Sequence, residues 1–183
     1  MNLRIFKKPI LVNISSEQVQ RAKQFAQNVI NTVNYRDSNQ MNKAKIQQDH
    51  FISKIGEEAV ASVFRSYELQ VKGPDYKIYN AKAKSWEADL YIDDWELAVK
   101  TQKQSSANRY GLSWTFQSSP HRRDPILEDK QAWVCFVLCD ESKAYQARVY
   151  PPYQLHELVF KDPKLAYLKG KKQVVYAMDL PNF

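Results

Sequence analysis

The sequence predicts an α/β fold in which a mixed central β-sheet is flanked by helices. Three observations carry this prediction. Apolar residues recur at helical spacing over residues 17–34 and 46–66. Residues 87–102 alternate with a period of two and are interrupted by two aspartates, as in a hairpin. Residues 131–139 form a nearly continuous apolar run, which is typical of a strand buried on both faces.

The N-terminal quarter is expected to form an arm and one helix ahead of the core. Ser15, with Gln18 three residues later, has the pattern of a capped helix start, so a helix is expected over residues 17–34. A polar linker follows this helix. The expected organisation is therefore an N-terminal arm and helix over residues 1–44 and a core domain over residues 45–183.

The remaining elements are expected to be mostly strands. Alternation predicts a strand at residues 67–72, and the polar residues 101–110 are expected to be a loop. Residues 119–125 form a basic loop bracketed by prolines. The further expected elements are strands at residues 111–118, 131–139, 144–150 and 173–178, and a short helix at residues 153–160.

The hairpin brings an acid and a lysine together. Asp89 opens its first strand and Lys100 lies in its second, so pairing would place both at neighbouring strand ends. Glu96, Ala98 and Lys100 share one face of the second strand. A carboxylate and a lysine on one strand pair can bind a divalent cation and polarise a phosphodiester together with its attacking water.

These residues resemble the signature of the PD-(D/E)xK nuclease superfamily, the fold of many restriction enzymes and junction resolvases. Its signature is an acid, a short hairpin, and then Asp or Glu two residues before a lysine. Asp89 matches the first acid and Lys100 the lysine, but Ala98 stands where the middle acid is expected. Three explanations are open: a Glu-to-Ala variant, a carboxylate supplied from elsewhere, with Glu96 as the candidate, or a nuclease-like fold that has lost cleavage.

The resemblance covers about residues 52–150 and implies a restriction-endonuclease-like core with further site residues. The run GEEAVASVF is similar to the GE-x-x-A helix that precedes the hairpin in several of these nucleases, and its glutamate reaches the metal site there. That match selects Glu57, whereas helix geometry alone does not choose between Glu57 and Glu58. The resemblance implies Mg2+, with Mn2+ as a substitute, held by Asp89, Glu57 and the Val99 carbonyl.

The charge of the chain agrees with a nucleic-acid partner. Lys and Arg number 27 against 20 Asp and Glu, which gives a net charge of +7 and favours a polyanionic partner. In the superfamily the segment after the lysine often approaches DNA, and the loop at residues 119–125 is the densest positive cluster. The expected DNA contacts are Lys103, Gln104, Asn108, Arg109, His121, Arg122 and Arg123.

The predicted function is a divalent-metal-dependent DNA endonuclease that hydrolyses phosphodiester bonds. The alternative is a non-catalytic nucleic-acid-binding protein with a nuclease-like fold. Many nucleases of this type act as dimers, and the helix at residues 17–34 offers a face for a homodimer. No phosphate-cradling glycine motif is present, so no nucleotide cofactor is expected.

The chain shows no secretory or membrane pattern. It contains no signal peptide and no apolar run long enough to span a bilayer, so a cytoplasmic location without a membrane partner is expected. Cys135 and Cys139 are too few for a disulfide framework and lie in an apolar run. They are therefore expected to be buried, reduced thiols.

Overall fold

The computed structural model describes residues 2–31, 42–79, 88–142 and 145–181. Its central sheet has the strand order β1-β8-β7-β4-β3-β2, with β9 also paired to β7. β4 and β7 run parallel and the other pairs run antiparallel, so the predicted mixed sheet is confirmed. Its strands are β1 (Ile10–Asn13), β2 (Val71–Lys72), β3 (Leu90–Ile92), β4 (Trp95–Lys103), β7 (Trp133–Asp140), β8 (Gln146–Val149) and β9 (Tyr153–Gln154).

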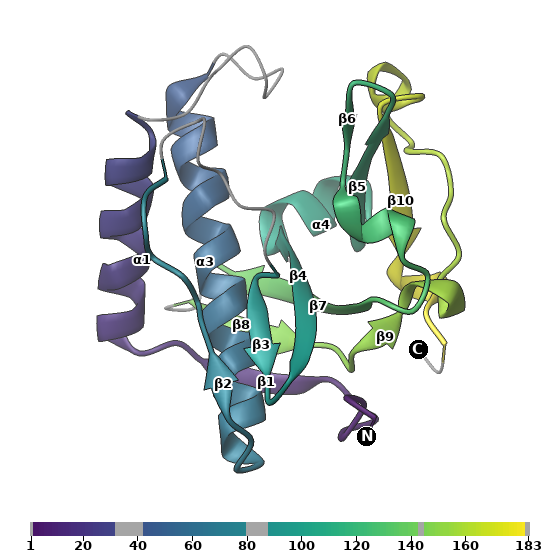
Figure 1. The fold of residues 1–183 in the computed structure, drawn as a ribbon. Coiled ribbons are helices and arrows are strands. Elements are labelled where there is room, and N and C mark those ends of the chain that lie inside the picture. The colour runs from purple at the N-terminus through teal and green to yellow at the C-terminus, as the bar shows by residue number, and fades with distance from the viewer. Residues whose placement is uncertain (1, 32–41, 80–87, 143–144, 182–183) are drawn as a thin grey trace.

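A second, smaller sheet has the order β10-β5-β6. In Figure 1 the helices α1 and α3 lie on one side of the molecule, the second sheet stands on the other, and α4 lies between them. The strands of the second sheet are β5 (Ser113–Ser119), β6 (Arg122–Arg123) and β10 (Lys172–Tyr176). The α-helices are α1 (Ser16–Val29), α3 (Lys43–Ser66) and α4 (Gln104–Tyr110). Short 3₁₀ helices are η1 (Pro125–Glu128), η2 (Leu155–Glu157), η3 (Ala166–Leu168) and η4 (Ala177–Asp179).

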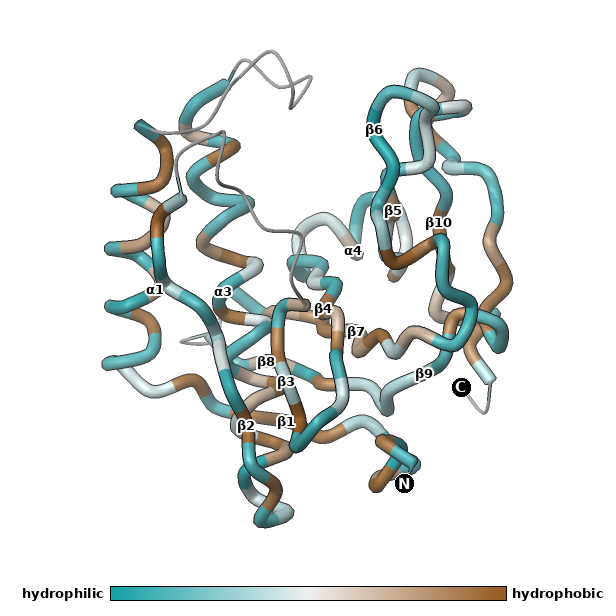
Figure 2. Tube along the Cα trace, viewed as in Figure 1, coloured by the Kyte–Doolittle hydropathy of each residue, from teal (hydrophilic) through white to brown (hydrophobic). Residues whose placement is uncertain are grey.

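Strand β7 separates two hydrophobic cores and is buried on both faces, as its continuous apolar sequence predicts. Trp133, Cys135, Val137 and Cys139 pack in the core on the α3 side. Val134, Phe136 and Leu138 pack in the core beneath the second sheet, together with Trp114 and Phe116 of β5. The hydropathy colouring of Figure 2 shows apolar residues along β7. Both cysteines are free and buried, which confirms the expected thiols.

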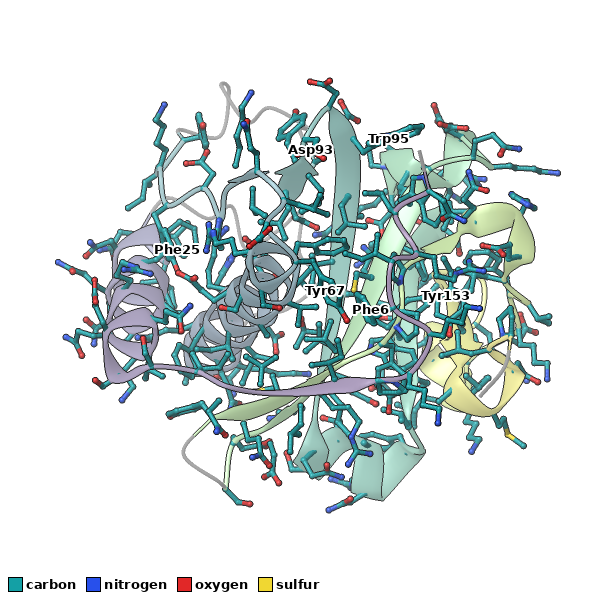
Figure 3. All side chains as sticks on the ribbon, turned by 90° about the horizontal axis from the view of Figure 1, so that it is seen from below. Phe6, Phe25, Tyr67, Asp93, Trp95 and Tyr153 are labelled. Carbon is teal, nitrogen blue, oxygen red and sulfur yellow. The ribbon has the colours of Figure 1, made fainter. Side chains whose placement is uncertain are left out.

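The N-terminal segment joins the central sheet. β1 pairs with β8, and Phe6 stacks on Tyr67 with 6.2 Å between the ring centroids (Figure 3). The expected boundary between residues 44 and 45 lies in the first turn of α3. The predicted N-cap of α1 is confirmed, because Ser15 and Gln18 form a capping box. The helix ends at Val29, earlier than predicted, and residues 32–41 of the expected linker lie outside the described residues.

The apolar face of α1 is covered by α3. Val19, Ala22 and Ala26 are buried, and α1 and α3 are in extensive contact. The face that the sequence offered to a homodimer is therefore occupied within the chain. Among the helices of the described residues, none has the length and the apolar content that crossing a bilayer requires.

The predicted loop at residues 101–110 was wrong. β4 continues to Lys103, and the next seven residues form α4. The Glu141 carboxylate caps this helix, accepting hydrogen bonds from the Gln104 N–H at 3.1 Å and the Ser105 hydroxyl at 2.5 Å. This cap comes from the turn after β7, so no local sequence pattern announces it.

Three further elements differ from the predictions. The basic loop expected at residues 119–125 contains β6, which pairs with the end of β5. The strand expected at residues 67–72 is reduced to β2, because Glu68 adopts a φ of 63° in a turn after α3. The helix expected at residues 153–160 is replaced by β9 and a 3₁₀ turn, because Tyr153 and Gln154 pair with the start of β7. At residues 67–72 and 153–160, long-range or backbone constraints override the local pattern.

Helix α3 approaches β4 very closely at Gly56. A Cβ atom on Gly56 would lie 1.8 Å from Thr101 Oγ1 and 2.9 Å from Thr101 Cβ. Ile55 and Ala59 are completely buried beside this contact. The absence of a side chain at Gly56 therefore sets how near the next residue, Glu57, comes to the hairpin.

Gly56→Ala is expected to lower the free energy of unfolding by about 1–3 kcal/mol, because it overpacks the α3–β4 contact. Alanine favours a helix over glycine by about 1 kcal/mol, so helix propensity alone would make the variant more stable. A loss of stability therefore shows that overpacking outweighs propensity. Urea denaturation of both proteins measures the change. Thr101→Ala removes the nearest atom, so the double variant should lose less than the sum of the single variants. A Gly56→Ala protein that is more stable than the wild type would contradict this account.

Candidate active site

Asp89 is held at the open end of the β3–β4 hairpin. Its Oδ2 atom accepts a hydrogen bond from the Val99 N–H at 2.7 Å. Loss of hydration around this half-buried carboxylate raises the pKa of Asp89, against the opposing effects of the Val99 N–H and the Lys100 charge. The Oδ1 atom makes no hydrogen bond with the described residues, so one oxygen is available to a ligand.

Glu57 is buried on α3 and is electrostatically coupled to Asp89. Burial, with a contribution from the negative charge of Asp89, raises the pKa of Glu57 to about 8. Lys54 Nζ lies 2.6 Å from one carboxylate oxygen and Ser53 Oγ lies 3.3 Å from the other. The ion pair with Lys54 acts in the opposite direction, but it does not outweigh the burial of Glu57.

Glu58 has a different and structural set of partners. It accepts hydrogen bonds from Arg21 at 2.9 Å, Gln18 at 3.0 Å and the Tyr76 hydroxyl at 2.8 Å. Burial acts to raise the pKa of Glu58, but these three bonds outweigh it and leave the pKa lowered. The geometry therefore separates the two glutamates: Glu58 joins α1 to α3, and Glu57 faces the hairpin acid.

Lys100 lies where the central sheet meets the second sheet. Its Nζ atom lies 2.7 Å from Asp124 Oδ2 and 4.9 Å from the centre of the Phe116 ring. Asp124 follows β6, and its Oδ2 also accepts the Gln117 N–H at 3.1 Å. Both partners of Lys100 thus belong to residues 113–124, which form β5, β6 and the residue after β6 and are called the β5–β6 arm below. Of this arm, only residues 121–123 were expected to contact DNA.

A pocket of about 550 Å³ opens beside these groups. The pocket is lined by Asp89, Ala98, Lys100 and Asp124. The hairpin acid, the lysine and the alanine that stands where the signature has its middle acid therefore face one space. Glu96 also lines the pocket, although its side chain is exposed near the hairpin turn and pairs in register with Tyr91. The apolar part of the wall comes from Trp95, Pro125, Ile126 and Trp133. Figure 3 shows Trp95 and Asp93 at the turn end of the hairpin.

The donors available to a cation are few. Within the ranges that the structure describes, no three His, Cys, Asp or Glu side chains are grouped closely enough to hold a metal ion. Val99, whose carbonyl was expected to be a ligand, is buried, and its N–H is engaged by Asp89. Glu57 has both oxygens in hydrogen bonds with Ser53 and Lys54. Asp89 is therefore the carboxylate best placed for direct coordination.

The expected DNA contacts fall into two groups. Lys103 ends β4 and donates to Gln48 at 3.0 Å, and Gln104 donates to Asn108 at 2.8 Å within α4. Arg109 lies over the Tyr110 ring. The second group, His121, Arg122 and Arg123, is carried by the β5–β6 turn and β6, which Figure 2 shows as hydrophilic. Gln104 and Asn108 were expected to contact base edges, but here their side chains form a hydrogen bond with each other.

Two residues of this site were not predicted. Lys54 stands three residues before Glu57 on α3, a spacing that brings helix side chains together and was readable in the sequence. Asp124 lies 24 residues after its partner Lys100, directly after the basic residues 121–123. No local pattern indicates that its carboxylate turns toward the hairpin.

Comparison with protein-family models, with curated proteins and with solved structures found no match. The resemblance to the PD-(D/E)xK nucleases therefore depends on the residues of the hairpin and of α3 alone.

The two glutamates are expected to affect stability in opposite ways as pH changes. The raised pKa of Glu57 means that the folded state keeps a proton that the unfolded state loses, so its contribution to stability falls as pH rises from about 4.5 to about 8. The lowered pKa of Glu58 stabilises the fold above its ordinary pKa, and this contribution is lost as pH falls.

Urea unfolding between pH 3 and pH 9 measures both effects. Glu57→Gln should remove the loss of stability between about pH 5 and pH 8, whereas Glu58→Gln, its matched neighbour, should lower stability at neutral pH by about 1–3 kcal/mol. The same pH profile in Glu57→Gln and the wild type would show that Glu57 does not titrate in this range.

Proposed function

We propose that this chain is a divalent-metal-dependent DNA endonuclease of the PD-(D/E)xK type. The observation that supports this most is the shared pocket of Asp89 and Lys100, with Glu57 close enough for the Asp89 charge to raise its pKa. Asp89 and Lys100 share the pocket, and Glu57 lies outside its lining, within electrostatic range of Asp89. This grouping is what the resemblance implies for a nuclease site.

The donor chemistry fits Mg2+ or Mn2+. Mg2+ is a hard cation that commonly uses one or two carboxylates and keeps several waters, so three converging acids are not required. Asp89 Oδ1 would bind directly, and Glu57 through water. When bound, such an ion polarises the phosphate and lowers the pKa of a coordinated water.

The chain's own residues supply the rest of the chemistry. The Lys100 ammonium stands on the wall of the pocket, where it would bind a phosphate oxygen, stabilise the charge that develops on it and orient the attacking water. Phe116 and Asp124 fix the position of this ammonium before a substrate arrives. Basic residues on α4 and β6 would bind the flanking phosphates.

A cytoplasmic location and a homodimer belong to the same proposal. The homodimer is supported by the resemblance. The second candidate function is a nucleic-acid-binding protein without cleavage. Ala98 favours it, because the hairpin lacks the middle acid of the signature.

Plasmid cleavage with Mg2+ or Mn2+ tests the proposed activity. Lys100→Ala is expected to lower the rate by about 10²–10³-fold, the usual cost of losing a group that stabilises developing charge. Lys72→Ala, an exposed lysine on β2, is the matched control and should cut normally. Cleavage only in the Ala98→Glu form would identify this chain as a disabled copy. If neither form cuts while both bind DNA, the binding function replaces the nuclease.

DNA affinity at several salt concentrations tests the expected interface. Arg122→Ala should weaken binding across sequences and reduce the slope of log K against log salt by about 0.9, because one phosphate contact is lost. Lys7→Ala is the control, since the N-terminal arm and β6 lie at opposite ends of the molecule in Figure 1. Equal slopes in both variants would contradict the assignment of β6 to the interface.

A further inference from the structure

We propose that Asp124 supplies the carboxylate that the hairpin lacks at position 98. The inference rests on the proposed nuclease function and adds one catalytic residue, a cation ligand, to the same site. This acid comes from the second sheet, whereas the signature carries its middle acid on the hairpin strand.

Asp124 is fixed in place by three interactions. Its backbone N–H donates to the Gln117 carbonyl at 2.9 Å, and its Oδ2 accepts both the Gln117 N–H and the Lys100 ammonium. Its Oδ1 makes no hydrogen bond with the described residues. The carboxylate therefore has a defined orientation and one oxygen available to a ligand, as Asp89 has.

Ala98 presents only a methyl group to the pocket that Asp124 lines. Ala98 and Lys100 alternate onto the same face of β4 and line the same pocket as Asp124. The methyl group of Ala98 leaves room that a glutamate side chain would occupy. Asp89 also lines this pocket, so the two carboxylates border one space.

The ion pair with Lys100 is compatible with this role. Without a cation, Lys100 neutralises Asp124, and their side chains are 25% and 19% exposed, so both are open to an incoming group. A bound divalent cation would take over the carboxylate. Lys100 would then be released toward the phosphate, where the proposed chemistry needs it.

The other carboxylates of the pocket are less suitable. Glu96 lies one strand repeat before Ala98, near the hairpin turn, and is exposed, whereas Lys100 pairs with Asp124. Asp129 also lines the pocket, but it is exposed in a local turn, and Lys100 pairs with Asp124 instead. Asp124 is thus the acid that combines contact with Lys100, a free oxygen and the empty space beside Ala98.

The test measures Mn2+ binding in the absence of DNA, through the electron paramagnetic resonance signal of free Mn2+. This readout is independent of activity. Asp124→Asn should weaken Mn2+ binding at least tenfold and lower plasmid cleavage at least 100-fold. Asp129→Asn, which removes the same charge from the same pocket, should change both less than twofold. Adding Ala98→Glu to Asp124→Asn should restore binding and cleavage.

A second pair of variants covers the case in which an unpaired Lys100 destabilises Asp124→Asn. Lys100→Met alone should keep Mn2+ binding, and Lys100→Met with Asp124→Asn should lose it. The inference is overturned if Asp124→Asn binds and cuts like the wild type, or if Ala98→Glu fails to restore a folded Asp124→Asn protein. If the wild-type chain neither binds Mn2+ nor cuts but its Ala98→Glu form does both, this inference is overturned and the nuclease site stands. If neither form binds Mn2+ or cuts, the proposed function itself is overturned.

Discussion

The close contact between Gly56 of α3 and Thr101 of β4 is the constraint on which the rest of the site depends. Because a helix can approach a strand this closely only where a side chain is missing, the chain places its single α3 glycine directly before Glu57. The approach brings a buried glutamate within electrostatic reach of Asp89. The close packing of α3 on β4 thereby determines the electrostatics of the site.

The site is assembled from two modules that meet at Lys100. The central sheet and α3 provide Asp89, Ala98 and Glu57, and the second sheet provides Phe116 and Asp124 around the lysine. Strand β7 joins the modules, since its two faces belong to two different cores. The β5–β6 arm thus contributes to the proposed active site as well as to the proposed DNA interface.

Features that depend on local pattern were predictable from the sequence. The capping box at Ser15, the hairpin after Asp89 and the buried strand β7 all follow from spacing and apolar alternation. Features set by distant partners were not: Glu141 caps α4 from another turn, and Asp124 reaches Lys100 from another sheet. The candidate site residues on the hairpin could therefore be predicted, because the motif is contiguous there. The contribution of Asp124 from the β5–β6 arm could not.

Anomalous diffraction from crystals soaked in Mn2+ tests the central claim most directly, because it locates the cation without requiring turnover. The account predicts one Mn2+ peak in the pocket beside Ala98, within coordination distance of Asp89 and Asp124 and close to Lys100. Asp89→Asn crystals should lose this peak. A pocket without a peak at saturating Mn2+, or a peak held by other residues, would contradict the account.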